Sequence, residues 1–198
     1  MATRADVRAK RDAASRKRDT ENRKWRTIVV DPPWRYNDLG GAHGTAKQYG
    51  TMTLCELLAL PLGQWAEPDA HLYVWTTNHF VREAVDLAEG WGFDLKTMLT
   101  WVKHREDQRW LGMGRYYRNA TEHVVFAARG KAPILRHDLS TVFHAPRGRH
   151  SAKPQAFYDM VETASPGPYL DVFARKQRMG WDVAGNEVYS VIPELAAK

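Results

Sequence analysis

A strand pattern that stops abruptly at Asp31-Pro32-Pro33-Trp34 constrains the fold of this chain more than any other feature. Thr27 to Val30 is a short, β-branched and mainly apolar run, which predicts a buried strand. The two prolines cannot donate a backbone hydrogen bond and hold φ at roughly −65°, so the strand ends there. The stiff strand end therefore presents a carboxylate, two carbonyls for which we expect no competing local donor, and an indole.

A flat base with an exocyclic amine suits such a strand end. The amine can donate to the carboxylate of Asp31 and to the carbonyl of Pro32, while the ring stacks on Trp34. Asp and Pro are also common in ordinary turns, so these four residues alone leave a purely structural role open.

Further motifs follow in a fixed order along the chain. They are Arg35-Tyr36, Gly112–His123, Ser151-Ala152-Lys153-Pro154, Leu170–Arg175 and Gly180–Glu187. In this order they resemble the MT-A70 family of adenine-N6 methyltransferases, over about residues 25–189. The resemblance implies methyl transfer from S-adenosylmethionine to N6 of adenine. It also implies a Rossmann-like, mostly parallel sheet with one antiparallel strand, and the circularly permuted motif order in which the catalytic strand precedes the cofactor strand.

The apolar periodicity independently predicts an α/β fold with helices on both faces of an open sheet. Strands are expected at 27–30, 71–76, 93–102, 121–127 and 169–173, and helices from Leu54 to before Pro61, over 80–91 and from Pro154 to Ala164. The glycine-rich stretch 37–52 is too long for an ordinary connection. We expect it to close over the base or the cofactor, or to be a disordered insertion.

Charge divides the chain into two predicted parts. Residues 1–26 hold ten Lys or Arg against four Asp or Glu, and this excess of six equals the formal charge of +6 of the whole chain. We therefore expect a basic arm over residues 1–24, helical or disordered, and a single methyltransferase domain over residues 25–198. The arm would attract phosphates without regard to sequence, or would serve only as a solubilising tail.

The resemblance assigns catalysis to Asp31, Pro32, Pro33 and Trp34. It assigns the binding of S-adenosylmethionine to Asp31, Lys153, Asp171, Phe173, Arg175, Asn186 and Glu187. Lys153 would pair with the methionine carboxylate, and the others would bind the sugar and the adenine. Asp171 stands where the family frequently has a longer Glu, and Gln177-Arg178 replaces a His-Asn type pair, which weakens the assignment of individual ribose contacts.

Aromatic rings and guanidinium groups that occur together predict the substrate-binding residues, because they stack on bases and contact phosphates. One loop combines such groups in Arg115, Tyr116, Arg118 and Asn119. Tyr36, which extends the strand-end motif, is a further candidate, and Glu122 would orient the loop or reach the target base, or is an ordinary strand carboxylate. No metal is expected: the eight His lack the spacing of a metal motif, Cys55 is the single cysteine, and a sulfonium that loses its charge needs no metal.

The sequence thus predicts adenine-N6 methylation of DNA, with RNA as the alternative substrate and a non-catalytic nucleic-acid-binding subunit as the second class. Cytosine-N4 transfer is disfavoured because that relative usually carries Ser in place of Asp31. The compact length is typical of bacterial or phage enzymes and leaves little room for target recognition, so a homo- or heterodimer is a further prediction. No apolar run reaches the roughly 20 residues of a membrane span, and the basic N-terminus is not followed by a signal-peptide core. The single Cys55 excludes an internal disulfide, which favours a reducing, cytoplasmic compartment.

Overall fold

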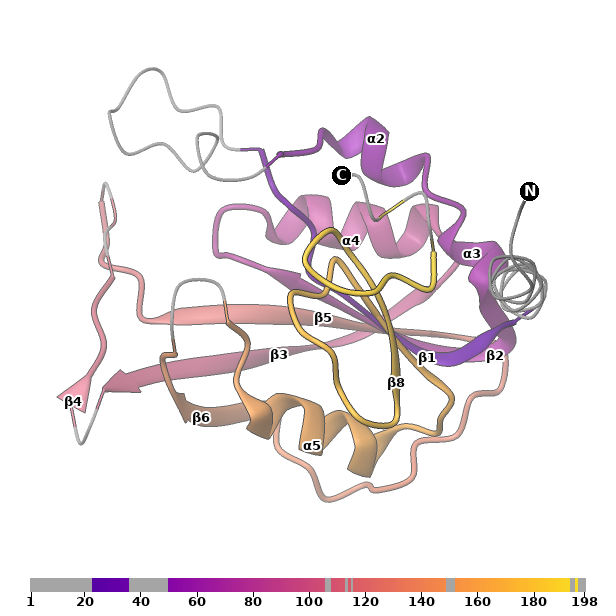
Figure 1. Cartoon of the computed structure of the whole chain (residues 1–198). Coiled ribbons are helices and arrows are strands. Elements are labelled where there is room, and N and C mark those ends of the chain that lie inside the picture. The colour runs from indigo at the N-terminus through magenta and orange to yellow at the C-terminus, as the bar shows by residue number, and fades with distance from the viewer. Residues whose placement is uncertain are drawn as a thin grey trace, which may run out of the picture.

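Eight strands of the described residues form one sheet in the computed structural model. The structure describes residues 23–35, 50–105, 108–112, 114, 116–148, 152–192 and 195. The strands are β1 (Trp25–Val30), β2 (Ala66–Thr76), β3 (Asp94–Arg105), β4 (Gln108–Arg109), β5 (Thr121–Arg129), β6 (Val142–Pro146), β7 (Tyr169–Val172) and β8 (Trp181–Ala184). The helices are α2 (Leu54–Leu58), α3 (Leu62–Trp65), α4 (Val81–Gly90) and α5 (Gln155–Ala164). The predicted α/β class is confirmed (Figure 1).

The sheet is mostly parallel. Its order is β4-β3-β5-β2-β1-β7-β8, and β6 pairs with β3. β1 runs parallel to β2 and to β7, β8 runs parallel to β7, and β6 runs parallel to β3. β5 is antiparallel to both of its neighbours, as the expected single antiparallel strand, and the two-residue β4 adds a second.

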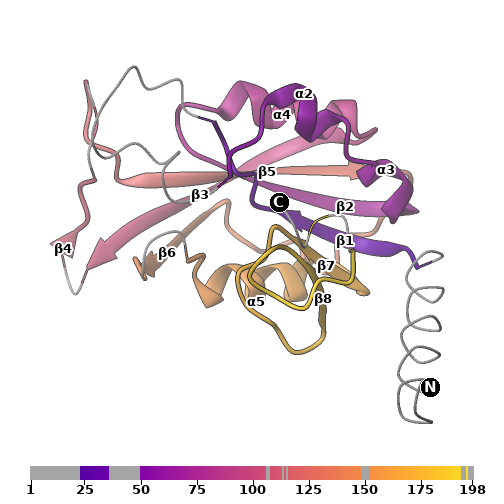
Figure 2. The same ribbon diagram turned by 45° about the horizontal axis from the view of Figure 1, so that its top comes forward.

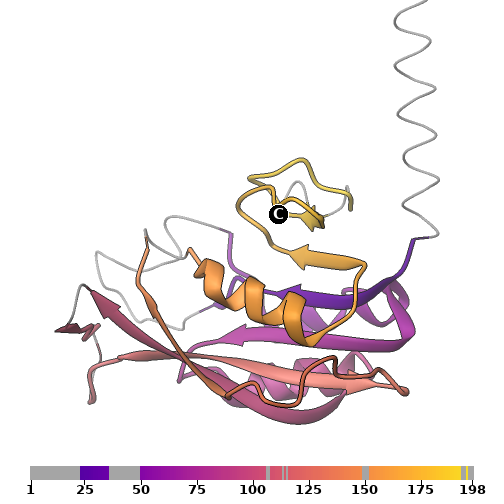
Figure 3. The same cartoon turned by 90° about the horizontal axis from the view of Figure 1, so that it is seen from below.

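Successive residues of β1 enter two different cores, because side chains of a strand alternate between the faces of a sheet. Ile28 and Val30 pack in the core that α2, α3 and α4 cover, and Val29 packs in the core that α5 covers. α2 and α4 lie on one side of the sheet and α5 on the other (Figure 2), and α5 stands in front of the sheet in Figure 3. β1 is therefore buried on both faces, which explains its continuous apolar sequence.

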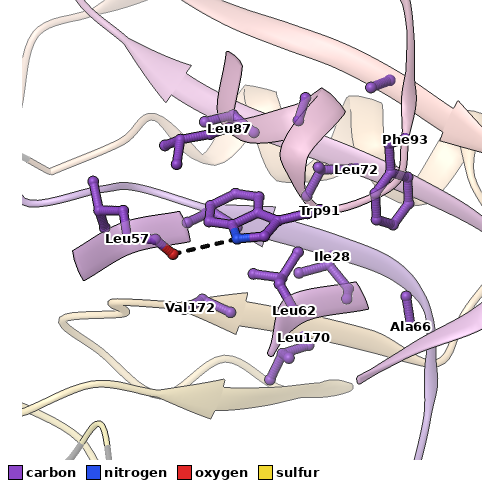
Figure 4. Close-up of a cluster of buried hydrophobic side chains, with 14 of the residues drawn as sticks. Ile28, Leu57, Leu62, Ala66, Leu72, Leu87, Trp91, Phe93, Leu170 and Val172 are labelled. Carbon is purple, nitrogen blue, oxygen red and sulfur yellow. Dashed lines mark hydrogen bonds between the residues drawn. The ribbon is translucent and has the colours of Figure 1, made fainter. Parts of the chain in front are cut away.

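The first of these cores contains a buried polar contact between two of its helices. Trp91 lies at the end of α4, and its indole N–H donates to the carbonyl of Leu57 at 3.3 Å (Figure 4). This bond satisfies the only polar atom of a large buried side chain and ties α2 to α4.

The position of β1 in the sheet marks a topological switch point. Its neighbours are β2 on one side and β7 on the other, and the connecting helices lie on opposite faces of the sheet. In open α/β sheets, the carboxyl ends of two such strands separate at this switch point and form the ligand site. The residues that follow β1 and β7 therefore border the expected site.

The structure departs from the expected elements at several places. β6, β8 and α3 were not predicted: β6 is a short, largely exposed strand that ends in proline, and the four residues of β8 fall within the motif Gly180–Glu187. β7 ends at Val172, one residue earlier than expected, because Phe173 has a φ of 63° and leaves the strand. In the part of the chain that the structure describes, no helix is long and apolar enough to cross a membrane.

Most of the predicted arm falls outside the described residues, which begin at Arg23. At this point the chain is tied to β8: the Arg23 guanidinium lies 3.1 Å from Asp182, and the indole N–H of Trp25 donates to the same carboxylate at 2.7 Å. Of the glycine-rich stretch 37–52, residues 37–49 also lie outside the described residues, so its expected closure stays a prediction.

Candidate active site

Asp31 lies at the switch point between β1 and β7. Its backbone N–H donates to the carbonyl of Val172, the last residue of β7, at 3.3 Å. Its side chain retains 24% of its exposure, so the carboxylate is accessible but mostly enclosed. The strand end predicted from the sequence therefore places the carboxylate of Asp31 at the switch point of the sheet.

The two proline carbonyls have backbone partners, contrary to expectation. The N–H of Trp34 donates to Pro32 at 2.8 Å, and the N–H of Met52 donates to Pro33 at 2.9 Å. The chain turns sharply after Pro32, which brings the N–H of Trp34 back onto the Pro32 carbonyl, whereas Met52 comes from a remote segment that forms an isolated parallel bridge with Trp34. A carbonyl oxygen has two lone pairs, so the Pro32 oxygen still has the capacity for one further hydrogen bond.

Two contacts hold the side chain of Trp34 in place. Its ring stacks on Phe80 with a centroid distance of 5.0 Å and an interplanar angle of 10°, and its indole N–H donates to the carbonyl of Trp75 at 3.2 Å. One face of the indole is thus covered by the protein. A base can stack only on the opposite face of the indole. Because the indole N–H is already hydrogen-bonded to Trp75, it does not contribute to the recognition of a base.

Four side chains of alternating charge, beginning with Asp31, lie in series. The ammonium of Lys153 lies 2.9 Å from Oδ1 of Asp31 and 3.3 Å from Oε2 of Glu122, and the ammonium of Lys103 lies 2.5 Å from Oε1 of Glu122. Lys153 stands just before α5, Lys103 near the end of β3, and Glu122 at the start of β5. Tertiary structure therefore joins three predicted residues with Lys103, which was not predicted.

Burial and charge set the protonation of this series. Burial raises the pKa of Asp31, and the neighbouring Lys153 opposes this shift. Although burial acts against it, the carboxylates of Asp31 and Glu122 raise the pKa of Lys153 to about 12. Burial likewise disfavours the charge of Glu122, but the two lysines outweigh it and lower the pKa of this carboxyl. The side chain of Lys153 therefore stays positively charged at neutral pH, beside Asp31.

A second buried carboxylate belongs to Asp171, in β7. The hydroxyl of Tyr158 on α5 donates to its Oδ2 at 2.9 Å, and the guanidinium of Arg178 lies over the Tyr158 ring at 3.3 Å from the centroid. Burial raises the pKa of Asp171 to about 7, and the hydrogen bond from Tyr158 opposes this shift. Tyr158 and Arg178 were not predicted as cofactor-binding residues.

The remaining cofactor-binding candidates lie after β7 and β8. Phe173 has left-handed backbone, a strained state for an aromatic residue that turns the chain away from the sheet. Arg175 lies 4.0 Å from the carboxylate of Glu187, while Asn186 and Glu187 are exposed in the turn after β8. Adjacent parallel strands thus bring these four residues to the same edge as Asp31.

The predicted substrate-binding residues lie in different environments. Tyr116 is exposed on the surface, Arg118 donates to the carbonyl of Gly112 within its own loop, and Asn119 accepts a hydrogen bond from the side-chain amide of Asn78. Glu122 lies inside the charged series described above. Tyr36 and Arg115 lie outside the described residues, as does Ser151 of the Ser-x-Lys-Pro motif.

The donor set at this edge fits a ligand with an amino-acid part and a nucleoside part. Lys153 can pair with a carboxylate, and Asp31 and Asp171 can accept hydrogen bonds from an ammonium and from hydroxyls. Among the described residues, no group of three His, Cys, Asp or Glu side chains is arranged to hold a metal ion.

Comparison with known proteins connects this geometry to a family. The MT-A70 family model matches residues 25–187. The chain is 30% identical over 189 residues to "Type II methyltransferase M.MunI" of a Mycoplasma species, covering 84% of this chain and 78% of that protein. It is 27% identical to the "N(6)-adenosine-methyltransferase subunit METTL3" of Danio rerio, covering 88% and 30%. It is 26% identical to the "N(6)-adenine-specific methyltransferase METTL4" of Homo sapiens, covering 81% and 37%. The chain thus spans about a third of the length of these last two relatives.

Proposed function

Because this chain belongs to the MT-A70 family of N6-adenine methyltransferases, we propose that it uses S-adenosylmethionine to methylate N6 of adenine in DNA. The observation that carries the proposal is the position of Asp31 at the switch point of the sheet, against the ammonium of Lys153. RNA is the second candidate, supported by the similarity to METTL3, an adenosine methyltransferase. DNA is favoured by the similarity to M.MunI, a type II methyltransferase over most of whose length this chain aligns.

Asp31 and Pro32 act on the amine. The carboxylate of Asp31 and the second lone pair of the Pro32 oxygen each accept one N–H of the adenine amine, which draws its nitrogen out of conjugation with the ring. The lone pair of this nitrogen then becomes available for an in-line attack. Orientation of the reacting atoms alone can contribute on the order of 7 kcal/mol.

The cofactor supplies, when bound, a methyl group on a positively charged sulfur, which leaves with the electron pair of the carbon–sulfur bond as a neutral thioether. A bond forms between N6 and the methyl carbon, and N6 loses one proton. Asp31 is placed to take up this proton, because burial raises the pKa of its carboxyl.

In this scheme the ammonium of Lys153 can pair either with the carboxylate of Asp31 or with the carboxylate of the cofactor. In the structure it lies against Asp31, on the carboxylate that must accept the amine. We propose that Lys153 turns to the carboxylate of the cofactor's methionine part, which leaves Asp31 open to the base. Glu122 holds Lys153 in reach of both positions, since its ion pair with Lys103 fixes it in place.

The test of the proposed function is methyl transfer from a labelled donor to separate pools of duplex DNA, single-stranded DNA and RNA, with mass spectrometry of the nucleosides. We expect N6-methyldeoxyadenosine. N6-methyladenosine from RNA alone would replace the DNA proposal by the RNA alternative. Transfer that persists in Asp31→Ala would refute the catalytic assignment. Nucleic-acid binding without transfer to any pool would favour the non-catalytic subunit.

A further inference from the structure

We propose that the segment between β3 and β5 binds unpaired nucleic acid beside the target adenine, by stacking bases on Tyr116, Tyr117 and Trp110. This inference rests on the proposed function, because it specifies the form of nucleic acid that the same site accepts. We refer to residues 103–122, as far as the structure describes them, as the β3–β5 hairpin.

Two adjacent tyrosines of the hairpin are almost fully exposed. Tyr116 and Tyr117 each retain 90% of their accessible surface. Aromatic side chains bury large apolar areas, so neighbouring rings left in water indicate a surface that is completed by a partner. Every nucleobase offers a flat π-face to such rings, whatever its sequence.

The backbone that carries the tyrosines is braced. The N–H of Gly112 donates to the carbonyl of Asn119 at 2.7 Å, which closes the hairpin. The guanidinium of Arg118 donates to the carbonyls of Gly112 and Leu111, at 2.5 and 3.2 Å. A braced loop loses less conformational freedom on binding, so it presents its rings to a ligand in advance.

A third aromatic group joins the surface through a cation. The guanidinium of Arg147 lies over the ring of half-buried Trp110, 4.6 Å from its centroid. The N–H of Arg147 donates to the carbonyl of His104 at 3.0 Å, so the segment after β6 is attached to the hairpin. The pair places a positive charge next to an aromatic ring, which is the combination that phosphates and bases require.

Charge favours a polyanion as the partner. Residues 103–122 and 142–151 contain Lys103, Arg105, Arg109, Arg115, Arg118, Arg147 and Arg149 against Glu106, Asp107 and Glu122. These seven basic and three acidic residues leave a net charge of +4, whereas residues 27–198 as a whole are neutral. Glu122 is, moreover, engaged by Lys103 and Lys153. These two segments of the sequence thus carry a net positive charge, although residues 27–198 balance to zero.

The hairpin is continuous with the candidate active site. At its base, Glu122 contacts Lys153, which in turn contacts Asp31. Further along, the amide of Asn78 donates to Asn119 at 3.1 Å, and Asn78 belongs to the short segment that leads from β2 to Phe80. In Figure 1 the described part of the hairpin lies beyond the end of β3, next to β4. A strand whose adenine reaches Asp31 therefore passes over this surface.

The exposed rings select for unpaired bases. Bases inside a duplex are stacked on both faces and offer only their edges, so a tyrosine ring cannot stack on them without unstacking the helix. An unpaired strand pays no such cost. The surface therefore predicts tighter binding of single-stranded, frayed or mismatched substrate than of fully paired substrate of the same sequence.

The test is fluorescence anisotropy of the full chain with a labelled DNA of roughly 12 nucleotides, single-stranded or annealed to its complement, without any methyl donor. We expect wild type to bind the single strand more tightly, and Tyr116→Ala/Tyr117→Ala to lose at least tenfold of that affinity. Tyr116→Phe/Tyr117→Phe keeps both rings and should bind as wild type. Leu135→Ala, which removes an exposed apolar side chain elsewhere, is the matched control.

Three results would overturn the proposal. The alanine pair could bind the single strand as wild type does, the phenylalanine pair could lose as much as the alanine pair, or duplex could bind better than single strand. Light scattering of the same samples identifies the competing partner: if the alanine pair dissociates a dimer and leaves DNA binding intact, the rings serve a second copy of the chain. Titration with S-adenosylhomocysteine separates the two hypotheses, because cofactor binding tests the proposed function and does not depend on the tyrosines.

Discussion

The ammonium of Lys153 lies 2.9 Å from Oδ1 of Asp31, so the carboxylate that we assign to the adenine amine already has a cationic partner. Two ligands of one carboxylate compete. Lys153 also contacts a second carboxylate, that of Glu122, at 3.3 Å, which would keep its ammonium paired when it leaves Asp31. We therefore expect cofactor binding to lengthen the distance between the ammonium of Lys153 and the carboxylate of Asp31.

Lys153→Met should weaken the binding of S-adenosylhomocysteine at least tenfold, because a hydrogen bond to a charged group contributes about 1.5–3 kcal/mol. Isothermal titration calorimetry measures this directly. Lys96→Met is the matched control, since Lys96 lies on the surface and pairs with the exposed Asp94. Equal affinities of Lys153→Met and wild type would contradict the assignment of Lys153 to the methionine carboxylate.

Lys103→Met should destabilise the protein by about 1.5–3 kcal/mol, because Glu122 loses a close partner in a mostly buried site. The effect should also depend on pH. The lowered pKa of Glu122 contributes stability that is present above the pKa of the unfolded carboxyl and is lost as the pH falls. Removal of Lys103 raises this pKa, so part of that stability is already missing at neutral pH. Urea unfolding at pH 7 and pH 4 should show a difference from wild type that shrinks at pH 4.

Asp171→Asn should stabilise the cofactor-free protein, and increasingly so as the pH rises from 5 to 8. Burial raises the folded-state pKa of Asp171 to about 7, so between the unfolded value and pH 7 the native state binds a proton that the unfolded state has lost. The free energy of unfolding of wild type therefore falls as the pH rises through this window. The amide of the Asp171→Asn variant does not ionise, so the variant does not lose this stability. Thermal unfolding measures the gain, with Asp86→Asn on the exposed side of α4 as control. A constant difference between pH 5 and pH 8 would speak against an ionisable buried carboxylate.

Gly185→Ala should destabilise the fold by roughly 1–3 kcal/mol, because a Cβ at this buried position would collide with the carbonyl oxygen of Ala174. The collision separates the ends of β7 and β8, where Arg175 and Asn186 lie, so affinity for S-adenosylhomocysteine should fall as well. Gly50→Ala is the control, since a Cβ there meets no atom within 4 Å. Chemical denaturation that finds both variants equally stable would refute the close approach.

The local pattern of the sequence was sufficient for the α/β class and for the strand that ends at Asp31. A buried run followed by two prolines has few conformations available, so Thr27 to Val30 could be assigned without tertiary information. Short edge elements were less predictable. β6 has neither the length nor the burial that gives a periodic signal, and its strand form depends on pairing with β3.

The candidate site divides in the same way. The order of motifs along the chain identified Asp31 and Lys153 as members of one site, and both lie there. The partners of these residues could not be read from the chain. Lys103 and Glu122 are 19 residues apart and face each other only because β3 and β5 pair in register. The carbonyl of Pro32 acquires its donor only because the chain turns back after it.

The sequence by itself was therefore sufficient to predict the reaction class and the strand that carries the candidate catalytic carboxylate, since both predictions depend on local chemistry and on the order of motifs. Only the tertiary structure decided which charges meet. Ion pairing and burial depend on distances between segments remote in sequence, and these distances set the protonation of Asp31, Glu122 and Asp171. The tertiary structure also decided that Tyr116 and Tyr117 stay in water, because exposure is a property of what the rest of the chain leaves uncovered.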